Sequence, residues 1–232
     1  MQRRKFTAGL VGAAGLGAIS TFPQAAQAAG ISESDAALGV RAALERGAGA
    51  AVDLLGRSGG FLDNPKVRIE LPGYLKEAAK LLKYTGQQKR VDELVTAMNR
   101  AAEAAVPEAK SLLVGAVKAM SVEDAKQIIT GSDTAVTQFF ASKTRSALNL
   151  RFLPIVTQAT QKVSLAEKYN AIAGKASGMG LVGKDDANIE HYVTGKALDG
   201  LYLMIAEEER KIRKDPLGTG SAILSKVFGS LK

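Results

Sequence analysis

The chain has 232 residues, of which 46% are hydrophobic and 23% charged, and its formal net charge is +8 at pH 7. This balance is typical of a single globular domain rather than of a disordered or fibrous chain. Because the sequence contains no cysteine, disulfides, thiolate zinc sites, iron–sulfur clusters and a cysteine nucleophile are excluded. The only histidine, His191, excludes sites built from several imidazoles. Carboxylate sites for calcium or magnesium stay open in principle, but we expect no metal and no permanent cofactor.

Residues 1–28 have the pattern of a secretory signal peptide: a basic head, an apolar stretch rich in Gly and Ala, and an Ala-Gln-Ala ending. The head reads Arg3, Arg4, Lys5, Phe6, and glycines weaken the apolar stretch, which together favour twin-arginine export of a folded protein. An ordinary signal for unfolded chains is the alternative. Cleavage after Ala28 removes three basic residues and lowers the net charge from +8 to +5.

The first element expected after the signal is a helix over residues 32–55. Ser32 and Asp35 have the spacing of a capping box at its start, and Gly56 ends it. Its apolar residues recur at helical spacing, so one face of this helix is expected to be buried.

An extended arm is expected at residues 66–71, where apolar and charged side chains alternate. Val67, Ile69 and Leu71 form its apolar side. The sequence offers no second extended segment to pair with it, so the arm should lie against helices rather than in a sheet.

Eight further helices complete the prediction. They are expected at about 73–84, at 87–105, at 107–120, from Ser121, from Ser132 or Asp133, from Ser164, through Leu198 to Ile212, and in a short tail from Ile223 to Phe228. Pro154 is expected to bend or restart its helix, and a Gly-rich loop is expected over residues 174–183. The predicted fold is all-α: a single domain, residues 29–232, of roughly nine helices with one short extended arm.

Four phrases in the chain resemble an uncharacterised bacterial family of exported proteins, catalogued as domain of unknown function number 4197. They are GFLDNPKVRIELP at 60–72, MNRAAEAAVPEAK at 98–110, DTAVTQFFASKTRSAL leading to FLPIV at 152–156, and KALDGLYLMIAEEERKIR at 196–213. The resemblance covers essentially all of the chain after the signal. It implies export, and it implies no particular activity or catalytic residue.

A polar cluster is expected around Asn99, Arg100 and Glu103, which lie among alanines on a helix that should be largely packed. Buried polar groups are costly unless they are paired, so Arg145 or Asp199 could join them, and Asn99 could bond to Glu103 at i, i+4. Such a cluster either fixes the arrangement of the helices or lines a polar site, and both interpretations stay open here.

A second candidate surface is basic. The helix YLKEAAKLLKY presents lysines along one side, and two more cations follow it. Such a stripe can lie on an anionic membrane or partner, although a core-packed helix with solvated lysines has the same pattern. The residues of this surface are Lys76, Lys80, Lys83, Lys89 and Arg90.

Three other motifs are better explained without special chemistry. The loop GKASGMGLVGKD at 174–185 lacks the Ser or Thr and the preceding strand of a phosphate-binding loop. His191 has no nucleophile motif to serve, and we expect a partly buried or surface histidine. Glu207, Glu208 and Glu209 point about 100° apart on a helix, so they cannot converge on one ion; ion pairs to Lys211 and Arg213 are expected instead.

These observations predict an exported, periplasmic, cofactor-free helical protein that works by binding. It is expected to be a partner-binding module or a carrier of a small apolar or amphipathic ligand held between helices. The alternatives are a hydrolase that uses Glu103, Glu108 or Asp199, and a peripheral protein on an anionic membrane surface. Expected partners are the export machinery for folded proteins, a small ligand or a protein, and a weakly bound membrane. Nucleic acid is not expected, because aromatic residues are not interleaved with the basic ones.

Overall fold

Seven α-helices and two 3-10 helices make up the computed structural model over the residues that it describes, which are 33–75, 80, 84, 86–132, 134–180, 183 and 188–215. The elements are α1 (Glu33–Leu55), η1 (Gly73–Leu75), α3 (Gln88–Ala105), η2 (Val106–Glu108), α4 (Ala109–Lys118), α5 (Val122–Thr130), α6 (Ala135–Thr160), α7 (Ser164–Gly178) and α8 (Ile189–Lys214). No strand occurs in these ranges, so the predicted all-α class and single helical domain are confirmed. Nor does any helix there combine the length and the hydropathy that crossing a bilayer requires.

The described ranges hold seven α-helices rather than the nine expected. Of the expected helix 73–84, the structure describes η1 and the isolated positions 80 and 84. In η1 the Leu75 N–H donates to the Pro72 carbonyl at 2.9 Å. The expected tail helix and the signal segment 1–28, with Arg3, Arg4, Lys5 and Phe6, lie outside the described residues.

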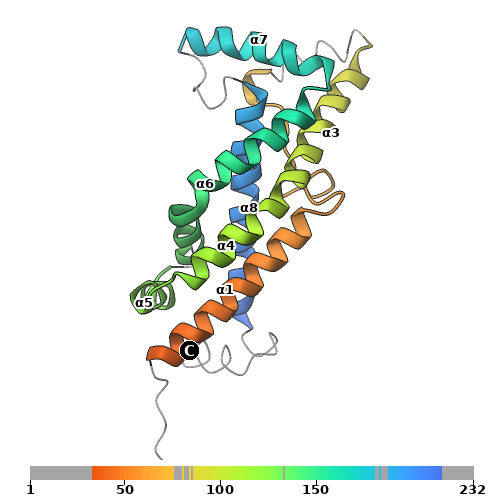
Figure 1. Ribbon diagram of the computed structural model, residues 1–232. Helices are drawn as coiled ribbons and strands as arrows, with labels where there is room; N and C mark the ends of the chain where they lie inside the picture. Colours follow the sequence, from red (N-terminus) through yellow and green to blue (C-terminus); the bar gives the residue numbers. More distant parts are fainter. Residues whose placement is uncertain are drawn as a thin grey trace, which may run out of the picture. The chain divides into compact units, whose positions relative to one another are not determined.

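Helix α8 forms the centre of the fold and packs against α1, α3 and α6 (Figure 1). It is buried on more than one side, because small or apolar residues cover most of its circumference from Ile189 to Ile212. Leu198, Leu201 and Ile205 are fully buried. The three helices around α8 are therefore positioned by contact with one common element.

Helix α6 runs without interruption through Pro154, so the expected restart at this proline is wrong. A proline inside a helix removes one N–H donor and leaves the carbonyl four residues earlier without its partner. Both Pro154 and Leu150 lie on the exposed side of α6, where water can bond to that carbonyl. The helix continues because its opposite side is anchored in the core by Leu148, Phe152 and Val156.

The predicted helix starts are confirmed in one case and wrong in two. Ser121 accepts a hydrogen bond from the Asp124 N–H, and Asp124 accepts one from the Ser121 N–H, which together form the expected capping box of α5. Helix α7 begins at Ser164 itself, after Val163, so Ser164 is not its cap. The residue before α6 is Thr134 rather than Ser132 or Asp133, and its side chain makes no capping hydrogen bond; Asp133 lies outside the described residues. The expected Gly-rich loop also starts later, because α7 continues to Gly178.

The arm of the structure is the whole segment between α1 and η1, residues 56–72, and the predicted stretch 66–71 is its last part. Lys66 and Val67 lie in a turn, closed by hydrogen bonds from the Val67 and Arg68 N–H groups to the Asn64 carbonyl, so only residues 68–71 of that stretch lie outside helix and turn. Val67 and Ile69 are buried, Leu71 is half-buried, and the charged residues between them are exposed. The turn in the first part of the arm requires glycine at Gly60, where a Cβ would clash with the Leu55 carbonyl oxygen. Phe61 follows this turn and is fully buried. The arm therefore reaches the centre of the fold.

Candidate functional site

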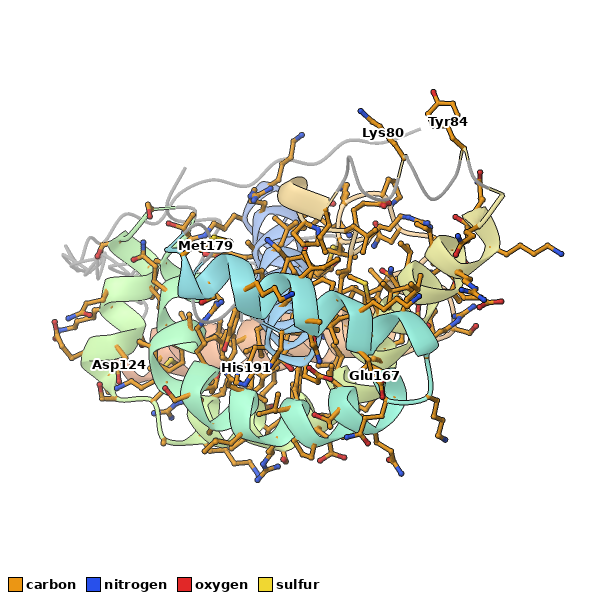
Figure 2. All side chains as sticks on the ribbon, turned by 90° about the horizontal axis from the view of Figure 1, so that it is seen from above. Lys80, Tyr84, Asp124, Glu167, Met179 and His191 are labelled. Atoms are coloured by element: carbon orange, nitrogen blue, oxygen red, sulfur yellow. The ribbon has the colours of Figure 1, made fainter. Side chains whose placement is uncertain are left out.

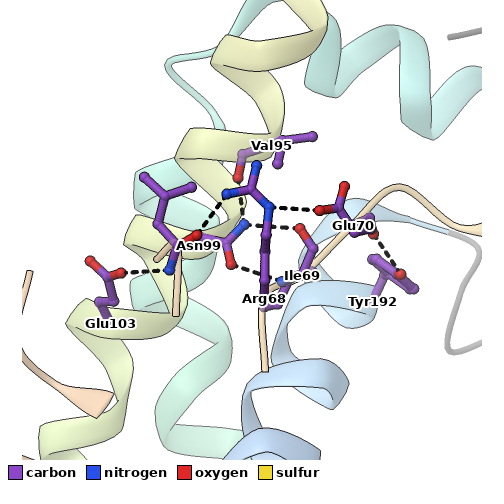
Figure 3. Close-up of polar contacts among 8 residues, drawn as sticks. Arg68, Ile69, Glu70, Val95, Asn99, Glu103 and Tyr192 are labelled. Atoms are coloured by element: carbon purple, nitrogen blue, oxygen red, sulfur yellow. Dashed lines mark hydrogen bonds and ion pairs between the residues drawn. The ribbon is translucent and has the colours of Figure 1, made fainter. Parts of the chain in front are cut away.

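Asn99 on α3 bonds to the backbone of the arm from a fully buried position (Figure 3). Its Oδ1 accepts from the Ile69 N–H at 2.8 Å, and its Nδ2 donates to the Ile69 carbonyl at 2.9 Å and to the Val95 carbonyl at 2.8 Å. The amide thus pairs with Ile69 as a neighbouring strand would, which satisfies backbone groups that the arm cannot satisfy itself.

Glu103 lies one turn further along α3 and holds the first part of the arm. Its Oε1 accepts from the Phe61 N–H at 3.1 Å and from the Leu62 N–H at 3.0 Å, and its Oε2 accepts from Arg100 Nη1 at 2.6 Å. Burial alone would raise the pKa of Glu103, but the hydrogen bonds from Leu62, Arg100 and Phe61 outweigh it and lower the pKa below its ordinary value. The carboxylate is therefore kept ionised.

Only part of the expected polar cluster comes together. Arg100 reaches Glu103 and also Ser58 Oγ, at 2.8 Å, but Asn99 and Glu103 bond to different parts of the arm rather than to each other. Arg145 and Asp199 form a separate, largely exposed ion pair between α6 and α8, 2.6 Å long. The expectation that these two residues join the cluster is therefore not met.

Tyr192 and Tyr202 connect α8 to its neighbours, and the sequence analysis did not single out either role. The Tyr192 hydroxyl donates to the Glu70 carbonyl at 2.8 Å, so the arm is fixed from α8 as well as from α3 (Figure 3). The Tyr202 hydroxyl is 2.9 Å from Thr144 Oγ1, and burial raises the pKa of Tyr202 although Thr144 and Arg145 oppose this. These contacts are structural in character.

A groove of about 350 Å³ lies between α4, α5 and α6. The residues that line it are Ser111, Leu112, Gly115, Ala116, Ala119, Asp124, Phe139, Lys143 and Thr144. Small side chains on α4 leave the space open, and a Cβ placed on Gly115 would meet nothing within 4 Å. Asp124 already takes part in the capping box of α5. The hydrogen bonds from Ser121 lower the pKa of Asp124, and the charge of Lys143 lowers it further. No sequence motif predicted this groove.

Two other depressions are less suited to a small ligand. The apolar one between α1, α5, α6 and α8, which reaches Glu209 and Arg213, encloses only about 20 Å³ and has room for about one water molecule. The other is wide and shallow, about 660 Å³, and lies where the first turns of α3 meet Lys162 and Val163.

The expected basic surface is described only in part. Lys80, Lys89 and Arg90 are exposed, and Figure 2 shows Lys80 and Tyr84 projecting at one side of the fold. Lys76 and Lys83 lie outside the described residues. Lys89 shares the shallow depression with Asp92 and Glu93, so acids offset part of its charge.

The remaining motifs have structural explanations within the described ranges. His191 is exposed, and its backbone N–H donates to Asn188 Oδ1, so that the Asn188 side chain caps α8. Glu209 pairs with Arg213 as expected, but Glu207 pairs with Lys66 on the arm, and Lys211 pairs with Glu208. Of the residues that the structure describes, no three acids or histidines are placed to hold a metal ion.

The fold and the groove together define an all-helical chain with a small open site between helices. The chain belongs to the family described as Protein of unknown function (DUF4197), whose model matches residues 30–229. No curated protein and no solved structure was found to match it. The family description names no activity, so any function has to be argued from the chain's own residues.

Proposed function

We propose that this protein is an exported, non-catalytic binding protein that carries a small apolar or amphipathic ligand in the groove between α4, α5 and α6. The observation that carries the proposal is the groove itself. Its volume of about 350 Å³ falls within the range of known small-molecule sites, about 300–1,000 Å³.

The lining of the groove favours an amphipathic anion. Leu112, Ala116 and Phe139 offer apolar surface, and Lys143 is the one cation among the lining residues. Lys143 takes part in none of the ion pairs among the described residues, and Asp124, the lining carboxylate on which its charge acts, is already bonded to Ser121. A ligand with an apolar chain and an acidic head would match both features.

The hydrolase alternative finds less support in the three carboxylates proposed for it. Glu103 has both oxygens engaged and a lowered pKa, which is the opposite of what a general acid needs at neutral pH. Glu108 and Asp199 are exposed, and Asp199 is paired with Arg145. Binding is therefore the function that this geometry supports best.

Binding of cis-parinaric acid, a fluorescent fatty acid, tests the proposal. Gly115→Leu should block the groove and weaken binding at least about tenfold, whereas Gly49→Leu, a matched change at another helical glycine with open space, should not. Lys143→Gln should weaken binding about fivefold or more through the lost charge, and Lys118→Gln should leave it unchanged. Equal binding by all four variants, or no binding by the parent chain, would rule the groove out.

Export through the folded-protein route is part of the same proposal, and Arg3, Arg4, Lys5 and Phe6 support it. Replacing Arg3 and Arg4 together by lysine should keep the precursor in the cytoplasm, because that route discriminates between the two side chains. Lys5→Arg, which leaves the arginine pair intact, is the control. Unchanged appearance of the double variant in the periplasm would point to the ordinary signal instead.

A further inference from the structure

Helix α7 lies across one end of the bundle formed by α3, α6 and α8 (Figure 1). It packs on α3 and α8 through one face only, which carries Leu165, Tyr169 and Ala173. Asn170 fixes it to α8, because its Oδ1 accepts from the Ile189 N–H at 2.8 Å. The other side of α7, its outer face, carries side chains that are exposed within the described part of the chain, among them Lys168, Ile172 and Lys175.

The outer face of α7 combines cations with exposed apolar side chains. Lys168, Ile172 and Lys175 follow one another at i, i+4 and i+7, which places them on one strip of α7, and Met179 is the residue that directly follows the last helical residue, Gly178. Ile172 is 47% and Met179 69% exposed, although large apolar side chains are normally turned inward at such positions. Figure 2 shows α7 from this outer side, with Met179 at one end.

The remainder of the outer face contains little that would oppose contact with a flat surface. Beside the strip, α7 exposes Ala171, Gly174 and Gly178, which are small, and one acid, Glu167. Lys162, in the turn before α7, is exposed and adds a third cation at this end.

We propose that this outer face of α7 binds reversibly to the surface of an anionic lipid bilayer. Lysines flanking apolar side chains on an exposed helix face are the chemistry of an interfacial helix, in which ammonium groups meet lipid phosphates and apolar side chains enter the headgroup boundary. Because α7 lies across the end of the bundle, its whole length can meet a plane at once. This proposal does not depend on the ligand groove, which is lined by α4, α5 and α6.

The position of this surface differs from the one expected from sequence. The run from Lys76 to Arg90 drew attention because its cations are dense. Among its described residues, however, Lys89 shares a shallow depression with Asp92 and Glu93, and the exposed apolar component is the single aromatic side chain of Tyr84 rather than an aliphatic one. Ile172 on α7 and Met179 at its C-terminal end supply aliphatic surface directly beside the lysines.

Flotation with vesicles of phosphatidylglycerol and phosphatidylcholine tests the proposal, with the chain that begins at Ala29, so that the basic and apolar segment before it makes no contribution. Every described helix lies in the compact unit that this chain retains. At low salt it should float with the mixed vesicles and not with pure phosphatidylcholine. Lys168→Gln with Lys175→Gln should lower the partition coefficient about 25-fold, since each cation near an acidic surface is worth about fivefold.

Two matched variants complete the experiment. Lys110→Gln with Lys118→Gln removes the same charge from α4 and should leave partitioning nearly unchanged, and Ile172→Asn should weaken it while Leu150→Asn on α6 does not. Circular dichroism checks that all variants stay folded. No flotation at low salt, equal losses in the α4 and α7 lysine variants, or binding only to an acidic protein and not to vesicles would overturn the proposal.

Discussion

Replacing Glu103 by alanine tests whether the α3 carboxylate supports the fold by holding the arm. The change leaves the Phe61 and Leu62 N–H groups without their acceptor and Arg100 without its partner. An unsatisfied buried donor costs about 1–3 kcal/mol, and the Leu62 N–H, being only partly buried, costs less. Together with the lost charge-assisted bond to Arg100, the expected loss of unfolding free energy is about 3 kcal/mol.

Glu103→Gln separates the hydrogen bonds from the charge. The amide oxygen can still accept from the arm, so this variant should lose only about 1 kcal/mol. It should also change the response to acid. The pKa of Glu103 is lowered in the folded state from an ordinary value of 4.5, so its contribution is complete above that pH and is lost as the pH falls through the folded-state pKa. The Gln variant lacks this loss.

Urea unfolding followed by far-UV circular dichroism, at neutral pH and at a series of acidic pH values, measures both effects. Glu93→Ala is the matched control, because Glu93 is an exposed carboxylate on the same helix and should change stability by less than about 0.5 kcal/mol. A Glu103→Ala protein as stable as this control would show that the contacts to the arm contribute nothing. The carboxylate would then have to be reconsidered as part of a site.

Three further predictions concern stability. Gly200→Ala should lower the unfolding free energy by about 1–3 kcal/mol, because the new Cβ would lie 2.8 Å from the buried Phe61 ring. The control is Gly195→Ala on the same helix, where a Cβ meets nothing within 4 Å; it should be neutral or stabilising by up to about 1 kcal/mol. The opposite order of melting temperatures would refute the packing argument. Ser121→Ala should cost about 1 kcal/mol through the lost cap, and an unchanged urea midpoint would contradict this. Tyr192→Phe should also cost about 1 kcal/mol through the lost bond to the arm; hydrogen exchange should then rise in the arm, and protection equal to the parent's would argue against the contact.

Local patterns in the sequence predicted much of the fold. Helical spacing predicted the long helices, Ser121 and Asp124 predicted the start of α5, and the alternation at residues 66–71 predicted the arm and its buried side. These features depend on neighbours within a few residues, so the sequence contains the information directly. Of the two outcomes expected at Pro154, a bend or a restart, the restart is wrong. Propensity counts the missing N–H donor but cannot show that the carbonyl left without a partner, that of Leu150, lies on the exposed side of the helix.

Contacts between distant residues were not predictable in the same way. Asn99 bonds to Ile69, 30 positions away, and Glu207 pairs with Lys66, 141 positions away, rather than with Lys211 four positions along. The place of Phe61 against Gly200 likewise follows from the packing of the arm on α8. No sequence motif marks the groove, because the groove forms where small residues of α4 face α6. That juxtaposition depends on how the helices pack and is absent from the local sequence pattern.

The described buried carboxylates indicate where function should be sought. Glu103 is bonded to Arg100 and to the arm, and Glu209 is bonded to Arg213, which also donates to the Ile128 carbonyl. The hydrogen bonds from the arm and from Arg100 keep Glu103 ionised, so moving a proton through it would cost stability. Glu103 is thus poorly suited to acid–base chemistry. Gly115 and Lys143 in the groove, and Lys168, Ile172 and Lys175 on α7, are instead exposed. Substitutions there should change binding at constant stability, and substitutions at Glu103 should change stability first.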